Sequence, residues 1–162
     1  MPNTRIVPHL WYTREAEEAA AFYASIFPDS RVDTVTVVPA DTPSGPEGAV
    51  KLVEFTLMGQ PFQAISAGPL DEFNHAISFV VECEDQAELD RYWDALGDGG
   101  KVEECGWVRD RYGVAWQVVP RVLGEHMKAR DRAAARRVAE AMLKMKKLDV
   151  AGLEAAYRGR AA

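Results

Sequence analysis

The order of hydrophobic and polar positions along the chain predicts two similar halves. In the first half, apolar residues recur with helical spacing over 14–26, and Pro28 ends that helix. Alternating and β-branched positions predict strands at 5–12, 31–38, 50–57 and 61–67. A loop rich in Pro and Gly occupies 39–48, and the short turn after Leu57 joins the last two strands as a hairpin.

The second half repeats this order. Asp85 followed by Glu88 is a capping box that opens a helix over 86–96. Strands are predicted at 75–83, 101–109 and 114–119. The fold class is therefore α+β, with two βαβββ modules of curved mixed sheets, at about 4–68 and 74–122, in one domain over 1–122. The concave sheet faces are the expected place for a ligand.

Residues 123–162 form a different segment, a basic helical extension. Val138, Met142 and Met145 recur with helical spacing, and Asp149 is placed to cap a second short helix. This apolar stripe is too narrow to form a core alone, so it is expected to pack on the body of the chain or on a second subunit.

Charge is divided unevenly between body and extension. The net charge of −6 combines −12 over residues 1–120 with +6 over 121–162. A body this acidic repels phosphates, which disfavours nucleic acid as a partner. With 48% hydrophobic and 27% charged residues, the composition is that of a soluble globular protein. The chain has no apolar run of membrane-spanning length, no apolar N-terminal stretch of signal-peptide type, and only two cysteines, a pattern that predicts a cytoplasmic protein.

Several short segments resemble one known family. They are Pro-His-Leu-Trp-Tyr at 8–12, Ala-Ala-Ala-Phe-Tyr at 19–23, Ile-Phe-Pro-Asp-Ser at 26–30, Ala-Ile-Ser-Phe-Val-Val at 76–81, Cys-Gly-Trp at 105–107, Asp-Arg-Tyr-Gly-Val-Ala-Trp-Gln-Val-Val-Pro at 110–120 and Ala-Met-Leu-Lys-Met-Lys-Lys-Leu-Asp at 141–149. Together they resemble the PhnB-like proteins, known as 3-demethylubiquinone-9 3-methyltransferase domain proteins. These belong to the glyoxalase/bleomycin-resistance/dioxygenase group, also called the vicinal oxygen chelate superfamily.

The resemblance implies the glyoxalase fold and a homodimer, but it implies function only loosely. The superfamily includes isomerases, dioxygenases, thiol transferases and metal-free drug-binding proteins. A methyltransferase using S-adenosylmethionine usually has a Gly-rich turn after a strand and before a helix, whereas the glycines at 97–100 follow a helix and precede a strand. The sequence therefore contains no visible S-adenosylmethionine site.

The resemblance also suggests where a divalent metal would bind. The superfamily's histidines lie in the first strand of each module, where this chain has His9 and His75, and Gln117 occupies the usual carboxylate position. Aligned on the motifs, however, His9 and His75 are each displaced by one residue, which turns a strand side chain to the opposite face. We therefore expect no metal; if one binds, its ligands are His9, His75 and Gln117.

Two functions remain open at this stage, and so does the question of whether the protein is an enzyme. The first is a glyoxalase-fold protein that binds a small organic molecule in its sheet cavity, through Gln117 with Trp107, His75 and His9 near the mouth. The alternative is a divalent-metal-dependent lyase, isomerase or transferase acting on a substrate with adjacent oxygens. Glu54 and Asp110 are the remaining candidates for an acid–base group, and neither has a partner visible from sequence.

Overall fold

The computed structural model describes residues 6–160, and the chain divides into two compact units, 1–72 and 73–162. The first unit contains β1 (His9–Tyr12), α1 (Ala16–Ile26), β2 (Arg31–Val37), β3 (Lys51–Leu57) and β4 (Gln60–Ser66). The second begins with β5 (Phe79–Cys83), α2 (Gln86–Gly97), β6 (Lys101–Val102), β7 (Trp107–Arg109) and β8 (Ala115–Pro120). Each unit thus contains one βαβββ module, as predicted. The first strand, expected over 5–12, begins only at His9, and its expected first residue, Arg5, lies outside the described residues.

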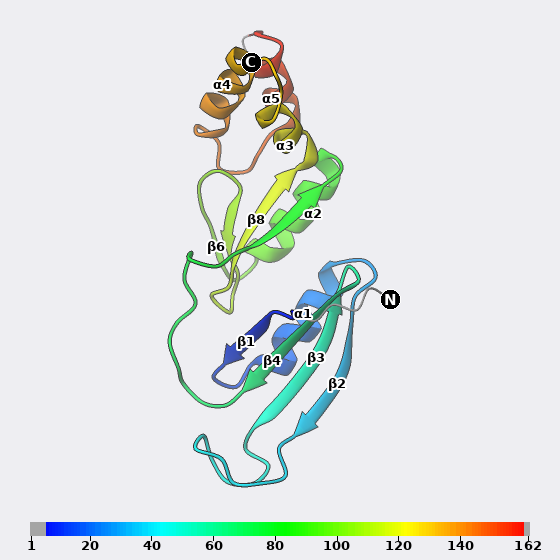
Figure 1. Ribbon diagram of the computed structural model, residues 1–162, viewed down its shortest axis with the longest axis vertical. Helices are drawn as coiled ribbons and strands as arrows, with labels where there is room; N and C mark the ends of the chain where they lie inside the picture. Colours follow the sequence, from blue (N-terminus) through cyan, green and yellow to red (C-terminus); the bar gives the residue numbers. More distant parts are fainter. Residues whose placement is uncertain (1–5, 161–162) are drawn as a thin grey trace. The chain divides into compact units, whose positions relative to one another are not determined.

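The first sheet is mixed, with strand order β1-β4-β3-β2 and β1 parallel to β4. The β3–β4 hairpin turns at Met58 and Gly59, both with positive φ, which is the backbone geometry that two-residue hairpins favour. Helix α1 covers one face of this sheet (Figure 1). Its buried side is made by the residues whose spacing predicted the helix, Ala16, Ala19, Ala20 and Tyr23.

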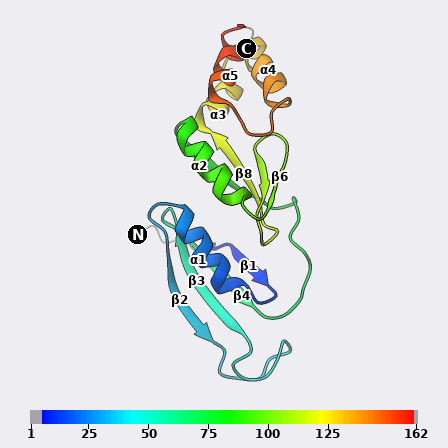
Figure 2. The same cartoon turned by 180° about the vertical axis from the view of Figure 1, so that it is seen from behind.

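The second sheet repeats this design, with order β5-β8-β7-β6 and β5 parallel to β8. Helix α2 covers one face, as the view from behind shows (Figure 2). The Asp85 carboxylate accepts a hydrogen bond from the Glu88 amide at 2.8 Å, so the predicted N-cap is confirmed. Helix α2 covers only one face, and the other face, hereafter the open face, has no helix from the described part of its own unit against it.

Two predicted strands of the second half were wrong in extent. The strand expected over 75–83 begins only at Phe79, because the Asn74 side chain accepts the Ala76 amide at 2.8 Å and holds a turn there. The strand expected over 101–109 is divided into β6 and β7. Cys105 and Gly106 both have positive φ, at 58° and 82°, and this left-handed backbone ends the extended chain.

The helical extension, expected from residue 123, begins already at Arg121: it forms α3 (Arg121–Met127), α4 (Arg132–Met142) and α5 (Val150–Tyr157). The Asp149 carboxylate caps α5 as predicted. No helix among residues 6–160 is long and apolar enough to cross a membrane. Of the two expected packing modes, the structure shows the extension in contact with the second module of its own chain. The amide side chain of Gln86 donates to the Leu148 carbonyl at 3.1 Å and accepts the Val150 amide at 2.8 Å.

The link between extension and module continues at the turn that separates β6 from β7. The amides of Cys105 and Gly106 donate to the carbonyls of Met145 and Lys146, both at 2.8 Å. Leu148 is fully buried, and its side chain would lie 3.1 Å from a Cβ placed on Gly106. A side chain at position 106 would therefore displace the extension, in addition to straining a backbone with φ of 82°.

A charged contact also joins the extension to α2. The Lys147 ammonium lies 3.2 Å from both Asp90 and Asp94 on that helix. Burial by itself would lower the pKa of Lys147, but its hydrogen bonds to the two carboxylates outweigh this and raise the pKa. Hydrogen bonds from Gln86 and then Lys147 lower the pKa of Asp90, so both partners are charged at neutral pH. The basic extension thus contacts the acidic body of its own chain.

Candidate functional site

The open face of the second sheet carries a row of mixed side chains. Gln117 on β8 is paired in register with Trp107 on β7 and with Val80 on β5. Their neighbours along each strand, Val108 and Val118, are fully buried on the side of α2. Because side chains alternate along a strand, Trp107, Gln117 and Val80 lie on the face that α2 does not cover. An indole, an amide and an exposed apolar side chain thus share one row.

The segment 75–78, hereafter the crossing segment, passes over this face. His75 contacts Arg109 on β7 and Glu103, which directly follows β6, whereas the chain enters β5 at the opposite edge of the sheet by residue 79. Near its end, the Ser78 hydroxyl accepts a hydrogen bond from the Gln117 side-chain amide at 2.9 Å. This bond fixes the orientation of the Gln117 amide group.

His75 is held at both ring nitrogens. Its Nε2 lies 2.6 Å from a carboxylate oxygen of Glu103, and its Nδ1 lies 3.1 Å from Nη2 of Arg109. A guanidinium can only donate, so Nδ1 is the acceptor and Nε2–H donates to Glu103. The ring also lies against Trp107, with centroids 5.5 Å apart and planes tilted by 56°. The structure thus brings together three of the four predicted site residues: His75, Trp107 and Gln117.

Glu103 and Arg109 are parts of this cluster that sequence reasoning missed. Arg109 follows Trp107 by two residues on β7, so both side chains lie on the open face. Its Nε is buried and has no hydrogen-bond partner among the described residues. An unpartnered buried guanidinium N–H is rare in proteins. Alternation along β7 could have indicated that Arg109 shares a face with Trp107. The contact of Arg109 with His75, 34 positions away, could not be predicted from the sequence.

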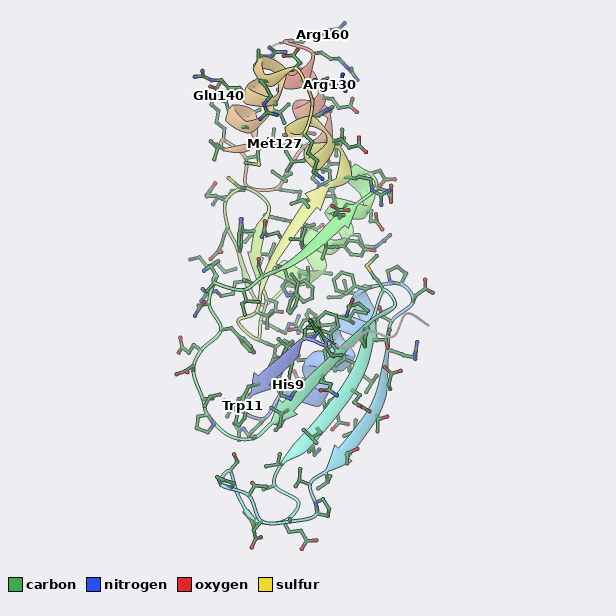
Figure 3. The ribbon with its side chains drawn as sticks, in the orientation of Figure 1. His9, Trp11, Met127, Arg130, Glu140 and Arg160 are labelled. Atoms are coloured by element: carbon green, nitrogen blue, oxygen red, sulfur yellow. The ribbon has the colours of Figure 1, made fainter. Side chains whose placement is uncertain are left out.

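His9 lies in the other unit, on the open face of the first sheet (Figure 3). Leu10 and Tyr12 are buried on the helix side, and the Tyr12 hydroxyl lies 3.2 Å from that of Tyr23 on α1. His9 therefore does not face the helix, as the motif alignment implied, because alternation along β1 turns it to the uncovered side. It is paired in register with Gln63, whose side-chain amide donates to Glu54 at 3.3 Å.

The two candidate acid–base groups both have partners. Glu54 accepts from Gln63, as described. Asp110 is buried at 3% exposure, and its carboxylate accepts from the amides of Tyr112 and Val114 and from the indole N–H of Trp116. Trp116 packs on the α2 side of the sheet, so Asp110 holds the β7–β8 turn and is not directed to the open face.

The two cysteines are placed differently. Burial, with a smaller effect of Glu88, raises the pKa of the Cys83 thiol to about 12, which keeps it protonated and unreactive at neutral pH. Cys105 lies in the turn between β6 and β7, where its amide bonds the extension. The glycines at 97–100 end α2 and precede β6, as predicted, and so do not form a strand-to-helix turn.

Comparisons with known proteins agree with this architecture. The sequence model of a family described as 3-demethylubiquinone-9 3-methyltransferase matches residues 4–119, and so ends before the helical extension. A PhnB protein from Bacillus cereus, provisionally described as a 3-demethylubiquinone-9 3-methyltransferase, is 31% identical, with a TM-score of 0.62. The alignment covers 72% of this chain and 99% of the Bacillus chain. The comparison with curated proteins found no match.

Two more distant structures share the fold. Protein PA1353 from Pseudomonas aeruginosa is 22% identical with a TM-score of 0.56, covering 73% of this chain and 98% of its own. The fosfomycin resistance protein FosX from Listeria monocytogenes is 19% identical with a TM-score of 0.54, covering 80% of this chain and 100% of its own. These likenesses confirm the glyoxalase fold that the repeated βαβββ order predicted.

Proposed function

Since the chain belongs to the 3-demethylubiquinone-9 3-methyltransferase family, the PhnB-like branch of the vicinal oxygen chelate superfamily, we propose that it binds a small organic molecule on the open face of its second sheet. The observation that carries this proposal is the row of Trp107, Gln117 and Val80, which combines an aromatic surface with an oriented amide on a face that no helix covers. Ligand sites typically combine apolar walls with a few fixed polar groups. The family resemblance also leads us to propose a homodimer, which light scattering on the intact chain would test.

The family description names a methyl transfer, but the proposal is limited to binding. No Gly-rich turn of the S-adenosylmethionine type joins a strand to a helix at 97–100. Cys105, in the turn before Trp107, bonds the extension through its backbone amide. The chemistry on the open face is therefore that of recognition: an amide, an indole, an imidazole and a guanidinium.

The superfamily implies a divalent metal, and the residues of the second unit do not fit one. Both nitrogens of His75 are engaged, and one of them accepts from the cationic guanidinium of Arg109. A metal at this imidazole would have to displace Arg109 or Glu103 and would lie beside a fixed positive charge. Among residues 6–160, no three His, Cys, Asp or Glu side chains are grouped closely enough to hold a metal ion.

We therefore predict that the protein does not retain a metal. After dialysis against Zn, Ni, Mn or Fe(II) separately, elemental analysis is expected to find far less than one metal per chain. The same measurement on His9→Ala and His75→Ala should give unchanged values. Near-stoichiometric metal that is lost in both variants would instead favour the metal-dependent enzyme, and it would mean that Arg109 moves away from His75.

The binding proposal is tested with a library of small aromatic acids, amides and alcohols. Ligands are expected to shift the NMR signals of the Trp107 indole N–H and the Gln117 side-chain amide. Gln117→Leu should weaken binding by about tenfold, because it removes one oriented hydrogen-bonding group. The fold should be kept, since Gln117 is only partly buried.

Gln60→Leu is the matched control, because Gln60 is exposed and lies on the first unit. It should bind the library members as the unaltered protein does. Ligands that shift only signals distant from the second sheet would place the site elsewhere, and a library without any ligand would remove the proposal. Unfolding of Gln117→Leu, seen by circular dichroism, would mean that this residue supports the core.

A further inference from the structure

We propose that the ligand of the second sheet is an organic oxyanion, an aromatic carboxylate or phosphonate, and that Arg109 is the residue that binds its charge. This inference rests on the proposed function, since it names the chemical class taken by the same site. It differs from metal binding, because a fixed guanidinium supplies the positive charge that a metal would otherwise bring to this face.

The first observation is the unsatisfied donor of Arg109. Nε–H is buried without a partner among the described residues, while Nη2 donates to His75. Nε and Nη2 lie on the same edge of the planar guanidinium, and this edge is a fork that matches the two oxygens of a carboxylate. In the free protein, Nη2 of this edge donates to the imidazole, while the Nε–H beside it is unpaired among the described residues. A carboxylate or phosphonate would satisfy both.

The second observation is the charge around this fork. Glu103 is the acidic partner in the cluster, and its carboxylate is shared between His75 at 2.6 Å and Lys101 at 3.9 Å. Apart from the imidazole, Lys101, Arg109 and Glu103 sum to a net charge of +1, although residues 1–120 as a whole carry −12. Glu82 is on the same face, two residues from Val80 on the opposite edge strand β5. A local positive charge in an acidic body favours an anion at that point.

The third observation is the position of the aromatic surface. Trp107 precedes Arg109 by two residues on β7, so indole and guanidinium are adjacent on one face, about 7 Å apart along the strand. This spacing suits a molecule with an oxyanion attached to an aromatic ring. Gln117, directly beside Trp107 in the next strand, can contact a polar substituent on that ring.

The binding step also has a consequence for His75. An oxyanion on the Nε–Nη2 edge displaces Nδ1 of His75 from Arg109, while Nε2–H can remain bonded to Glu103. His75 would then lose its contact with Arg109 and keep those with Glu103 and Trp107. Ligand binding should therefore be visible in the His75 ring signals as well as at Arg109.

The experiment compares three probes that share a phenyl ring: benzoate, the neutral benzamide of the same planar shape, and the tetrahedral anion phenylphosphonate. Binding is followed by titration of the intact protein with detection of the Arg109 Nε–H NMR signal. Benzoate or phenylphosphonate should bind at least tenfold more tightly than benzamide and shift this signal, and added salt should weaken the anions only. The two anions together test the shared oxyanion chemistry, and their ratio shows which of them the site prefers.

Arg109→Gln should remove the preference for the anions, so that benzoate and benzamide bind equally. Arg109→Lys should keep part of the preference, because it keeps the charge and loses the fork. Arg111→Gln is the control: this neighbouring arginine pairs with Asp98 at 2.6 Å, so its loss should leave the preference unchanged. If Arg109→Gln does not fold, the Nε–H signal of the unaltered protein still decides the question.

The outcomes separate this inference from the proposed function. Equal binding of all three probes, with shifts at Trp107 and Gln117 but none at Arg109 Nε–H, would overturn the anion site and leave the binding proposal intact. Anions that bind equally to Arg109→Gln and to the unaltered protein would also overturn it. Absence of binding by every probe and by the whole library would remove both.

Discussion

Replacing Asp110 with alanine is expected to lower the free energy of unfolding by about 3 kcal/mol, since it removes a buried carboxylate that accepts several hydrogen bonds. Two backbone amides, of Tyr112 and Val114, would lose their acceptor, which lies 2.8 and 3.1 Å away. The indole N–H of Trp116 would lose the other carboxylate oxygen at 2.8 Å. Urea unfolding followed by tryptophan fluorescence measures the change.

Asp110→Asn should lower the free energy of unfolding by about half as much as Asp110→Ala does. Its carbonyl oxygen can still accept from the two backbone amides, but its NH2 group would face the Trp116 N–H as donor against donor. The control is Asp98→Ala, because the Asp98 side chain is 76% exposed and makes only a surface ion pair with Arg111. Equal stability of Asp110→Ala and Asp98→Ala would contradict the structural role given to Asp110.

Leu148→Ala is expected to destabilise the second unit by about 3 kcal/mol, within the usual range for removing a buried leucine side chain. Leu148 is fully buried and packs on Gly106, next to the backbone hydrogen bonds that join residues 105–106 to 145–146. The cavity would weaken the contact between extension and module. The midpoint of the unfolding transition should move to a lower urea concentration. In limited proteolysis, the extension should be cleaved after a shorter time than in the unaltered protein.

Leu143→Ala is the matched control within the same extension. Leu143 is 65% exposed, and its truncation should change the free energy of unfolding by no more than about 0.5 kcal/mol. Equal effects of the two substitutions would mean that the extension is not anchored at Leu148. The same conclusion would follow if a chain lacking residues 124–162 were as soluble and as stable to heat as the whole protein.

Much of the fold was predictable because it depends on local patterns. The face of α1 followed from the spacing of Ala16, Ala19 and Tyr23, and the start of α2 from the side chain of Asp85. The strands around the Met58–Gly59 turn were correct for the same reason. These features depend on residues within a few positions of one another, so the periodicity and the capping residues of the sequence are enough to predict them.

The site was only partly predictable because it depends on distant pairs. His75 was singled out from the sequence and stays a prediction as a site residue, but its contacts Glu103 and Arg109 lie 28 and 34 positions away and carry no motif. His9 was expected on the wrong face, since an alignment of motifs does not fix which strand position faces the helix. The division of the 101–109 strand depended on a positive φ at Cys105, a residue that gives no such signal.

The crossing segment makes the length of the chain between His75 and β5 a determinant of the site. From β7 to β5 the sheet is two strand spacings wide, about 10 Å, and four residues reach at most about 14 Å. Loss of one residue here would cut this reach to about 11 Å, so the segment would have to be fully extended to keep the imidazole beside Glu103 and Arg109. An insertion or deletion among relatives can therefore change the position of His75 at this site. An engineered change of ligand could begin with the length of the segment 76–78 before any substitution.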